Sequence, residues 1–206
     1  RRDDNYDKEL ITIRESSAIK IYNLTFDENE NQPCTPVNNP ENCKGTILIS
    51  NSQDISIDKI AINHSKEASV EVYNSRKISI TNSNFVNAYL FGVILSSASG
   101  EHGSSASTVS ARVENNLFRD IKSNGFVLYQ TQATENDPII VKGNTFINNH
   151  RENVYLLCGP SGQSGNEPCP GGQLYLANDV ANVKIESNVI KDGSSKIGTG
   201  GIEFSN

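Results

Sequence analysis

The chain has 206 residues, a mass of 22.5 kDa, a formal net charge of −6 and an isoelectric point near 5.1. This length suits one domain, and the negative charge argues against a nucleic-acid partner, whose phosphates attract basic surfaces. Apolar residues make up only 35% of the chain, and 26 asparagines stand beside 15 glycines. Because Asn favours turns and left-handed backbone, this composition excludes a helical bundle.

The sequence shows no apolar run long enough to span a bilayer and no signal peptide, so we expect no membrane insertion. It also begins at Arg1 rather than Met, which predicts a processed or excised segment.

Four cysteines fall into two local pairs, Cys34 with Cys43 and Cys158 with Cys169, each in a stretch rich in Pro, Asn and Gly. We expect two disulfides that close loops, and therefore an extracellular or cell-surface location. The spacing does not match a CxxC zinc knuckle, so we expect no metal site.

Two Asn-X-Ser/Thr sequons begin at Asn23 and Asn63. Both are candidate N-glycosylation sites, although such matches arise readily by chance in a chain this rich in Asn.

An eight-residue pattern occurs six times, starting at residues 19, 55, 78, 111, 139 and 183. Its first and third positions are mostly apolar and its second and fourth mostly polar, which is the alternation of a β-strand. Asn recurs at the fifth or sixth position, and the eighth position is always Phe or Ile. We therefore expect a strand, an Asn-rich bend and an inward apolar residue in each unit.

A second strand pattern follows each unit, starting at residues 45, 69, 92, 125, 172 and 201, and Gly opens five of the six. The spacing of the units indicates a base turn of about 23 residues that carries insertions of different sizes. Such a period predicts an all-β fold, a right-handed parallel β-helix of about six coils. The eighth-position residues should then stack as one column in the core: Phe26, Ile62, Phe85, Phe118, Phe146 and Ile190.

The segments NSNFVNAYLFGVIL, ENNLFRDIKSNGFVL and GNTFINNHREN resemble the parallel β-helix repeats of the pectate-lyase-like superfamily. The resemblance implies one β-helix domain over residues 1–206, with residues 1–10 as an N-terminal extension and residues 11–206 as coils. The superfamily includes polysaccharide lyases, hydrolases and epimerases as well as adhesins and surface repeat proteins, so the fold does not set the activity. The NTD, GHG and RIK signatures of its hydrolases are absent from this sequence.

Both cysteine-bearing insertions follow the eight-residue unit, and two further insertions follow the second strand. Insertions that project from one edge of a solenoid often form its working surface, but most are simply tolerated loops.

A lyase or epimerase would need a base and a cation, either Ca²⁺ or a basic side chain, to neutralise a uronic carboxylate. The outward positions of the first strand offer Arg112, Lys142 and Lys184, interleaved with Glu114 and Glu186. Alternating charges of this kind are more typical of a solvated face.

His150 and Arg151 form the most reactive-looking cluster, since His can act as a base and Arg can bind a carboxylate. A triplet in a hydrophilic bend is more often plain surface. His64 and His102 have no evident partners in the sequence.

The second strand places Tyr73, Tyr129 and Tyr175 at outward positions, together with Leu48, Ile94 and Val127. Exposed columns of this kind can stack on sugars or pack against another chain, unless a loop covers them.

Neither end of the sequence offers an amphipathic cap, and the repeat stops after a second strand. The next element of the period would be a first strand, which the sequence provides near its start. We therefore favour a secreted structural protein that is not an enzyme and forms a head-to-tail homo-oligomer. The alternative is a lyase, an epimerase or a binding protein that acts on an acidic polysaccharide.

Overall fold

The structure is a computed structural model, and it describes residues 9–28, 45–97, 109–149, 173–177, 179–192 and 201–205. Nineteen β-strands lie within these ranges, and the described residues contain no helix. The search of the described residues for a helix able to cross a membrane found none.

The strands form three parallel sheets, which we call A, B and C. Sheet A contains β1 (Ile11–Arg14), β4 (Ile47–Ser50), β7 (Ala68–Tyr73), β10 (Phe91–Ser96), β13 (Phe126–Tyr129), β16 (Leu174–Ala177) and β19 (Ile202–Ser205). Sheet B contains β2 (Lys20–Tyr22), β5 (Gln53–Asp58), β8 (Arg76–Thr81), β11 (Ala111–Glu114), β14 (Ile139–Lys142) and β17 (Val183–Glu186). Sheet C contains β3 (Thr25–Asp27), β6 (Ala61–Asn63), β9 (Asn84–Val86), β12 (Leu117–Arg119), β15 (Thr145–Ile147) and β18 (Val189–Lys191).

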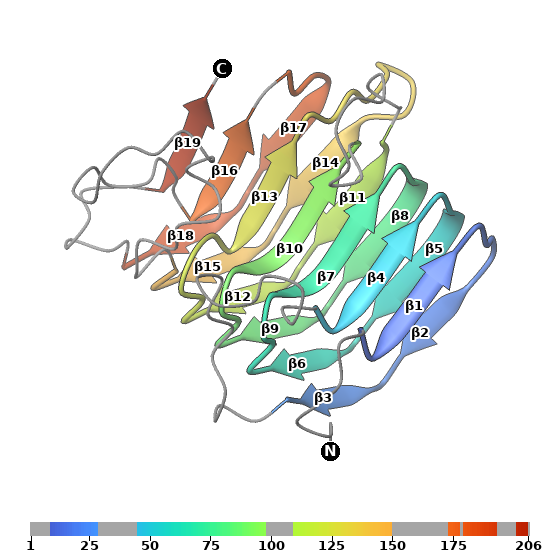
Figure 1. Ribbon diagram of the computed structural model, residues 1–206. Helices are drawn as coiled ribbons and strands as arrows, with labels where there is room; N and C mark the ends of the chain where they lie inside the picture. Colours follow the sequence, from blue (N-terminus) through green and yellow to red (C-terminus); the bar gives the residue numbers. More distant parts are fainter. Residues whose placement is uncertain are drawn as a thin grey trace, which may run out of the picture.

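The chain visits sheets A, B and C in turn, and each strand pairs with the strand three places later. Figure 1 shows the resulting stack of coils, with the N- and C-terminal ends at opposite ends of it. This is the parallel β-helix that the repeats predict. The eight-residue unit contributes two strands rather than one, because a bend at its fifth position separates sheet B from sheet C.

Each bend between sheets B and C is made by one residue with left-handed backbone. The φ angles lie between 51° and 65° at Asn23, Lys59, Asn82, Asn115, Gly143 and Ser187. Asn and Gly tolerate this conformation best, which explains their frequency at the fifth position.

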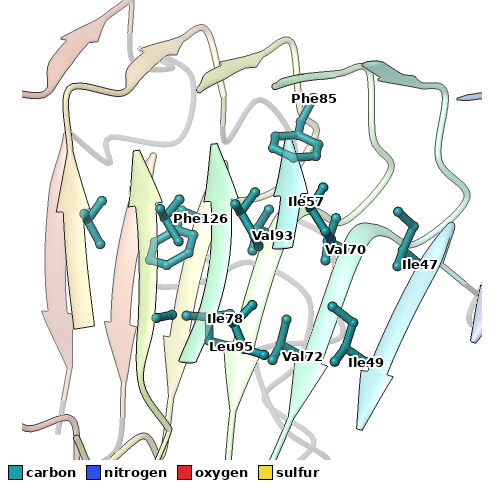
Figure 2. Close-up of a cluster of buried hydrophobic side chains, with 14 of the residues drawn as sticks. Ile47, Ile49, Ile57, Val70, Val72, Ile78, Phe85, Val93, Leu95 and Phe126 are labelled. Carbon is teal, nitrogen blue, oxygen red and sulfur yellow. The ribbon is translucent and has the colours of Figure 1, made fainter. Parts of the chain in front are cut away.

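The predicted core column is confirmed by the strand register. Phe26 pairs with Ile62 and the alignment continues through the four later eighth-position residues. The rings of Phe118 and Phe146 stack at 4.7 Å between centroids with an interplanar angle of 5°. Sheet A adds two more inward columns, and Figure 2 labels Ile47, Val70 and Val93 from the first.

The sixth position of the unit builds a hydrogen-bonded asparagine ladder in the coils that carry Asn there. The Asn144 Oδ1 atom accepts from the backbone N of Asn116 at 2.9 Å and from its Nδ2 at 3.0 Å. Asn188 Oδ1 accepts from Asn144 in the same way. In each step the acceptor belongs to the later coil, so the ladder has a direction.

A second ladder follows sheet C. Asn149 Oδ1 accepts from the backbone N of Ile121, and the side chain of Gln173 accepts from Asn149 in turn. Gln173 lies 24 residues after Asn149 in the sequence and takes the next place in this ladder. Polar side chains thus satisfy backbone donors at two buried corners of the solenoid.

Strand β1 forms a complete parallel pairing with β4 and begins at Ile11, where the coils were expected to begin, although its segment matches no eight-residue unit. The alignment of the second strand needs one correction. In sheet A, Thr46 and Gln173 stand in the column of Gly92 and Gly125, so Gly45 precedes that column by one residue.

Candidate functional site

The outer face of sheet B carries the basic residues that the sequence singled out. Arg112 lies one coil below Ile140 and two below Lys184, while Lys142 lies between Glu114 and Glu186 in the neighbouring column.

Ion pairs neutralise two of the three cations. An Arg112 guanidinium nitrogen lies 2.9 Å from Glu114 Oε1, and Lys142 Nζ lies 3.4 Å from Glu186 Oε2. Both cations and Glu186 are about half exposed or more, so these pairs contribute little stability. They do occupy the groups that would bind a uronate carboxylate. The register therefore brings the predicted basic residues onto one face but gives that face mixed charge.

His150 and Arg151 lie outside the described residues, as do His102 and the four cysteines, Cys34, Cys43, Cys158 and Cys169. The cysteine-bearing segments 29–44 and 150–172 connect β3 to β4 and β15 to β16, so both connect sheet C to sheet A. The expectation that the two loops project from the same turn of the solenoid stays a prediction, because both loops lie outside the described residues.

Part of the outer face of sheet A is buried. Tyr175 is only 5% exposed, and Val127 and Ile94 beside it are buried. These residues form a second apolar cluster with Leu90 and Phe91, and Tyr129 packs against it. Of the two alternatives for this column, an exposed surface or one covered by a loop, the burial of Tyr175, Val127 and Ile94 favours the second.

Tyr73 lies in a polar part of the same face. Its hydroxyl donates to Glu71 Oε2 at 3.0 Å. Burial, and then the nearby charges of Glu71 and Glu67, raise the pKa of the Tyr73 phenol well above its ordinary value.

Asp58 on sheet B is held by two neighbours from the next coil. Asn82 Nδ2 donates to its Oδ1 atom at 2.7 Å, and the Thr81 hydroxyl donates to the same atom at 2.8 Å. These bonds lower the pKa of the Asp58 carboxyl because they favour its charged form.

His64, for which the sequence suggested no partner, contacts the coils on both sides. Its Nδ1 atom lies 3.0 Å from Asp27 Oδ1, and its Nε2 atom lies 3.3 Å from Asn87 Nδ2. The strand register could have predicted these contacts. Asp27, Asn63 and Val86 align in successive coils, and His64 and Asn87 directly follow the last two of them. No group of His, Cys, Asp and Glu suited to a metal ion occurs among the described residues.

The two sequons lie in different surroundings. Asn23 is exposed at a left-handed bend, and Thr25 beside it is exposed. Asn63 accepts a hydrogen bond from Asn87, and the Ser65 hydroxyl is buried and donates to the Ala68 carbonyl at 2.8 Å.

The exposed apolar side chains gather at the two ends of the solenoid. Every large hydrophobic residue exposed within the described ranges belongs to the first or the last coil: Leu10, Ile19, Tyr22, Leu24, Val189, Ile202 and Phe204. The sequence pattern could not show this for Ile19, Ile202 and Phe204, because their positions are buried in the middle coils, whereas Tyr22 and Val189 stand at outward positions. These end coils are the candidate functional surfaces.

The sequence matches the family described as right handed beta helix region over residues 5–167. The chain therefore belongs to the right-handed β-helix family. The comparison with curated proteins found no match, and the comparison with solved structures found none.

Proposed function

We propose that this right-handed β-helix protein is a structural module of the cell surface or extracellular space that assembles end to end, one copy stacking head to tail on the next. The observation that carries the proposal is the confinement of exposed large hydrophobic residues to the end coils. Apolar surface that no coil covers favours association, because burial removes it from water.

The core columns support the same proposal. Phe85, Phe118 and Phe146 are fully buried, whereas Phe26 and Ile190 at the two ends of their column are only partly buried. A coil placed on either end would bury them, as the inner coils bury one another.

Charges at the two ends partly match. If β3 of a second copy pairs with β18 in the existing register, Asp27 of the second copy faces Lys191. Lys20 of the second copy would face Lys184, and this repulsion is offset by Glu186 two residues along the strand. The ends are therefore compatible but not fully complementary.

The predicted disulfides Cys34–Cys43 and Cys158–Cys169 support the extracellular part of the proposal, since disulfides persist in oxidising compartments. The carbohydrate-active alternative has less support, because Arg112 and Lys142 are already paired with glutamates.

The test is size-exclusion chromatography with light scattering over a range of concentrations, together with negative-stain electron microscopy. We expect filaments with an axial repeat of about 29 Å, from six coils at about 4.8 Å each. Leu24→Glu places a charge on an exposed end residue and should abolish assembly. Asn84→Glu on a lateral face should leave assembly intact. A monomer at every concentration would overturn the proposal.

A further inference from the structure

The strand count places a constraint on any head-to-tail stack. Sheet A has seven strands, whereas sheets B and C have six each, because β1 and β19 both belong to sheet A. The strands of the described residues therefore make six complete turns and one additional strand.

Consider a second copy whose β2 and β3 stack directly on β17 and β18. In sheet A, the β4 strand of the second copy must then stand two strand positions above the β16 strand of the first copy. One strand position remains between these two strands. The β19 strand of the first copy occupies that position, and so would the β1 strand of the second copy.

Both strands fit the position in the same register. Ile202 of β19 aligns with Leu174 of β16, and Ile11 of β1 aligns with Ile47 of β4, which lies in the same inward column. The residues Ile13 and Phe204 are equivalent in the next inward column. Two strands cannot share one place in a sheet, so one of them must leave.

Strand β19 is the less firmly held of the two. Its inward residues Ile202 and Phe204 are 42% and 71% exposed, whereas Ile13 of β1 is 7% exposed.

The segment after β1 is also bonded to the coil above it. The backbone N of Glu15 donates to the Ser50 carbonyl, and the backbone N of Ser16 donates to the Ser52 hydroxyl. Releasing β1 would break these bonds as well as the ladder, so releasing β19 costs less.

Resting on the proposed function, we infer that β19 is an exchangeable strand, which the β1 strand of the next copy displaces from the edge of β16. Assembly is then a competition for the β16 edge, and the hold of β19 on that edge limits the affinity between copies. The edge of β16 offers the same backbone groups to either strand, since both pair in parallel.

The test is the substitution Phe204→Asp, which weakens the hold of β19 on the sheet. If β1 displaces β19, the association constant between copies should rise by about threefold to tenfold, because less binding is lost on release. If β19 stays in the junction, the substitution buries a carboxylate there and assembly falls by about a hundredfold or more.

Two matched variants complete the test. Glu203→Gln alters the outward side of the same strand and should leave the association constant unchanged. Ile13→Asp weakens the incoming strand and should reduce assembly, with circular dichroism to check that the coils remain folded. Tighter assembly of Phe204→Asp supports strand exchange, and weaker assembly overturns it. Absence of assembly in the wild type and in every variant would instead overturn the proposed function.

Discussion

The ring of Phe118 occupies the space that a side chain at Gly92 would need. A Cβ atom placed at Gly92 would lie 2.6 Å from Phe118 Cδ1 and 2.4 Å from the Gly125 carbonyl oxygen. The aromatic column is thus packed against sheet A at a place where only a residue without a side chain fits. The same holds at Gly125, where a Cβ atom would lie 2.9 Å from Phe146 Cδ1, so an aromatic ring excludes a side chain at both positions.

Gly92→Ala should therefore destabilise the fold by about 2 to 4 kcal/mol, because the backbone oxygen cannot move away without disturbing the next coil. Gly201→Ala is the control, since its Cβ would meet Ile190 Cγ2 at 3.2 Å in the end coil. We expect it to cost less than about 1 kcal/mol. Urea unfolding measures both, and equal losses would contradict the packing argument.

Asn144→Ala should cost about 2 to 4 kcal/mol, because it removes the acceptor of the buried Asn116 backbone N and the side-chain donor to the Val113 carbonyl. Asn84→Ala, an exposed asparagine in β9, should change the free energy of unfolding by less than about 0.5 kcal/mol. If both variants unfold at the same urea concentration, the ladder does not stabilise the solenoid.

The Asp58 carboxyl should titrate below its ordinary pKa in a carbon-detected NMR titration. Asn82→Ala removes the larger of the two causes and should raise that pKa, and Thr81→Val should raise it less. Since the folded pKa is lowered, the associated stability is present above the unfolded pKa, near 4, and is lost as the pH falls through the folded value. A carboxyl pKa insensitive to Asn82→Ala would count against this assignment.

The stability contribution of Tyr73 should have the opposite pH dependence, with the loss at alkaline pH. Because its folded pKa is raised, its stability contribution is complete below the unfolded pKa, near 10, and is lost as the pH rises toward the folded value. Denaturant unfolding from pH 8 to 11 should show this loss. Tyr73→Phe should remove that part of the alkaline slope, and Glu71→Gln should lower the phenol pKa in an ultraviolet titration.

Of the two sequons, Asn23 should carry the glycan on folded protein secreted from a eukaryotic host. Its side chain is exposed, whereas Asn63 accepts a hydrogen bond and its Ser65 is buried. Enzymatic deglycosylation should lower the intact mass of the wild type and of Asn63→Gln. The mass of Asn23→Gln should not change, and occupancy at Asn63 would refute the assignment.

The sequence predicted the features that repeat and missed those that depend on a single place in the stack. The eighth-position column from Phe26 to Ile190 was predictable because inward apolar residues recur with the coil. The residues of β1 fall within the predicted coils, but the strand itself was not identified because no bend or Asn beside it fits the unit. The burial of Tyr175 was left open because alternation shows which side a residue faces and not what covers that side.

The candidate site was predictable only in outline. The register of Arg112, Lys142 and Lys184 followed from the repeat, but the ion pairs with Glu114 and Glu186 required side-chain geometry. The competition between β1 and β19 required the number of strands in each sheet, which the repeat units alone did not contain.

The parallel pairing of successive coils also decides how the protein bears tension. The two ends of the chain lie at opposite ends of the stack, and the bonds between coils join each coil to the next along that line. A pull on the ends would therefore load the coils in series and peel them off one at a time. Each event would release one turn, which is 23 residues where Ser52 and Ser75 mark successive coils. Stretching a single molecule should give a regular sawtooth, interrupted by longer steps where insertions lengthen the turn.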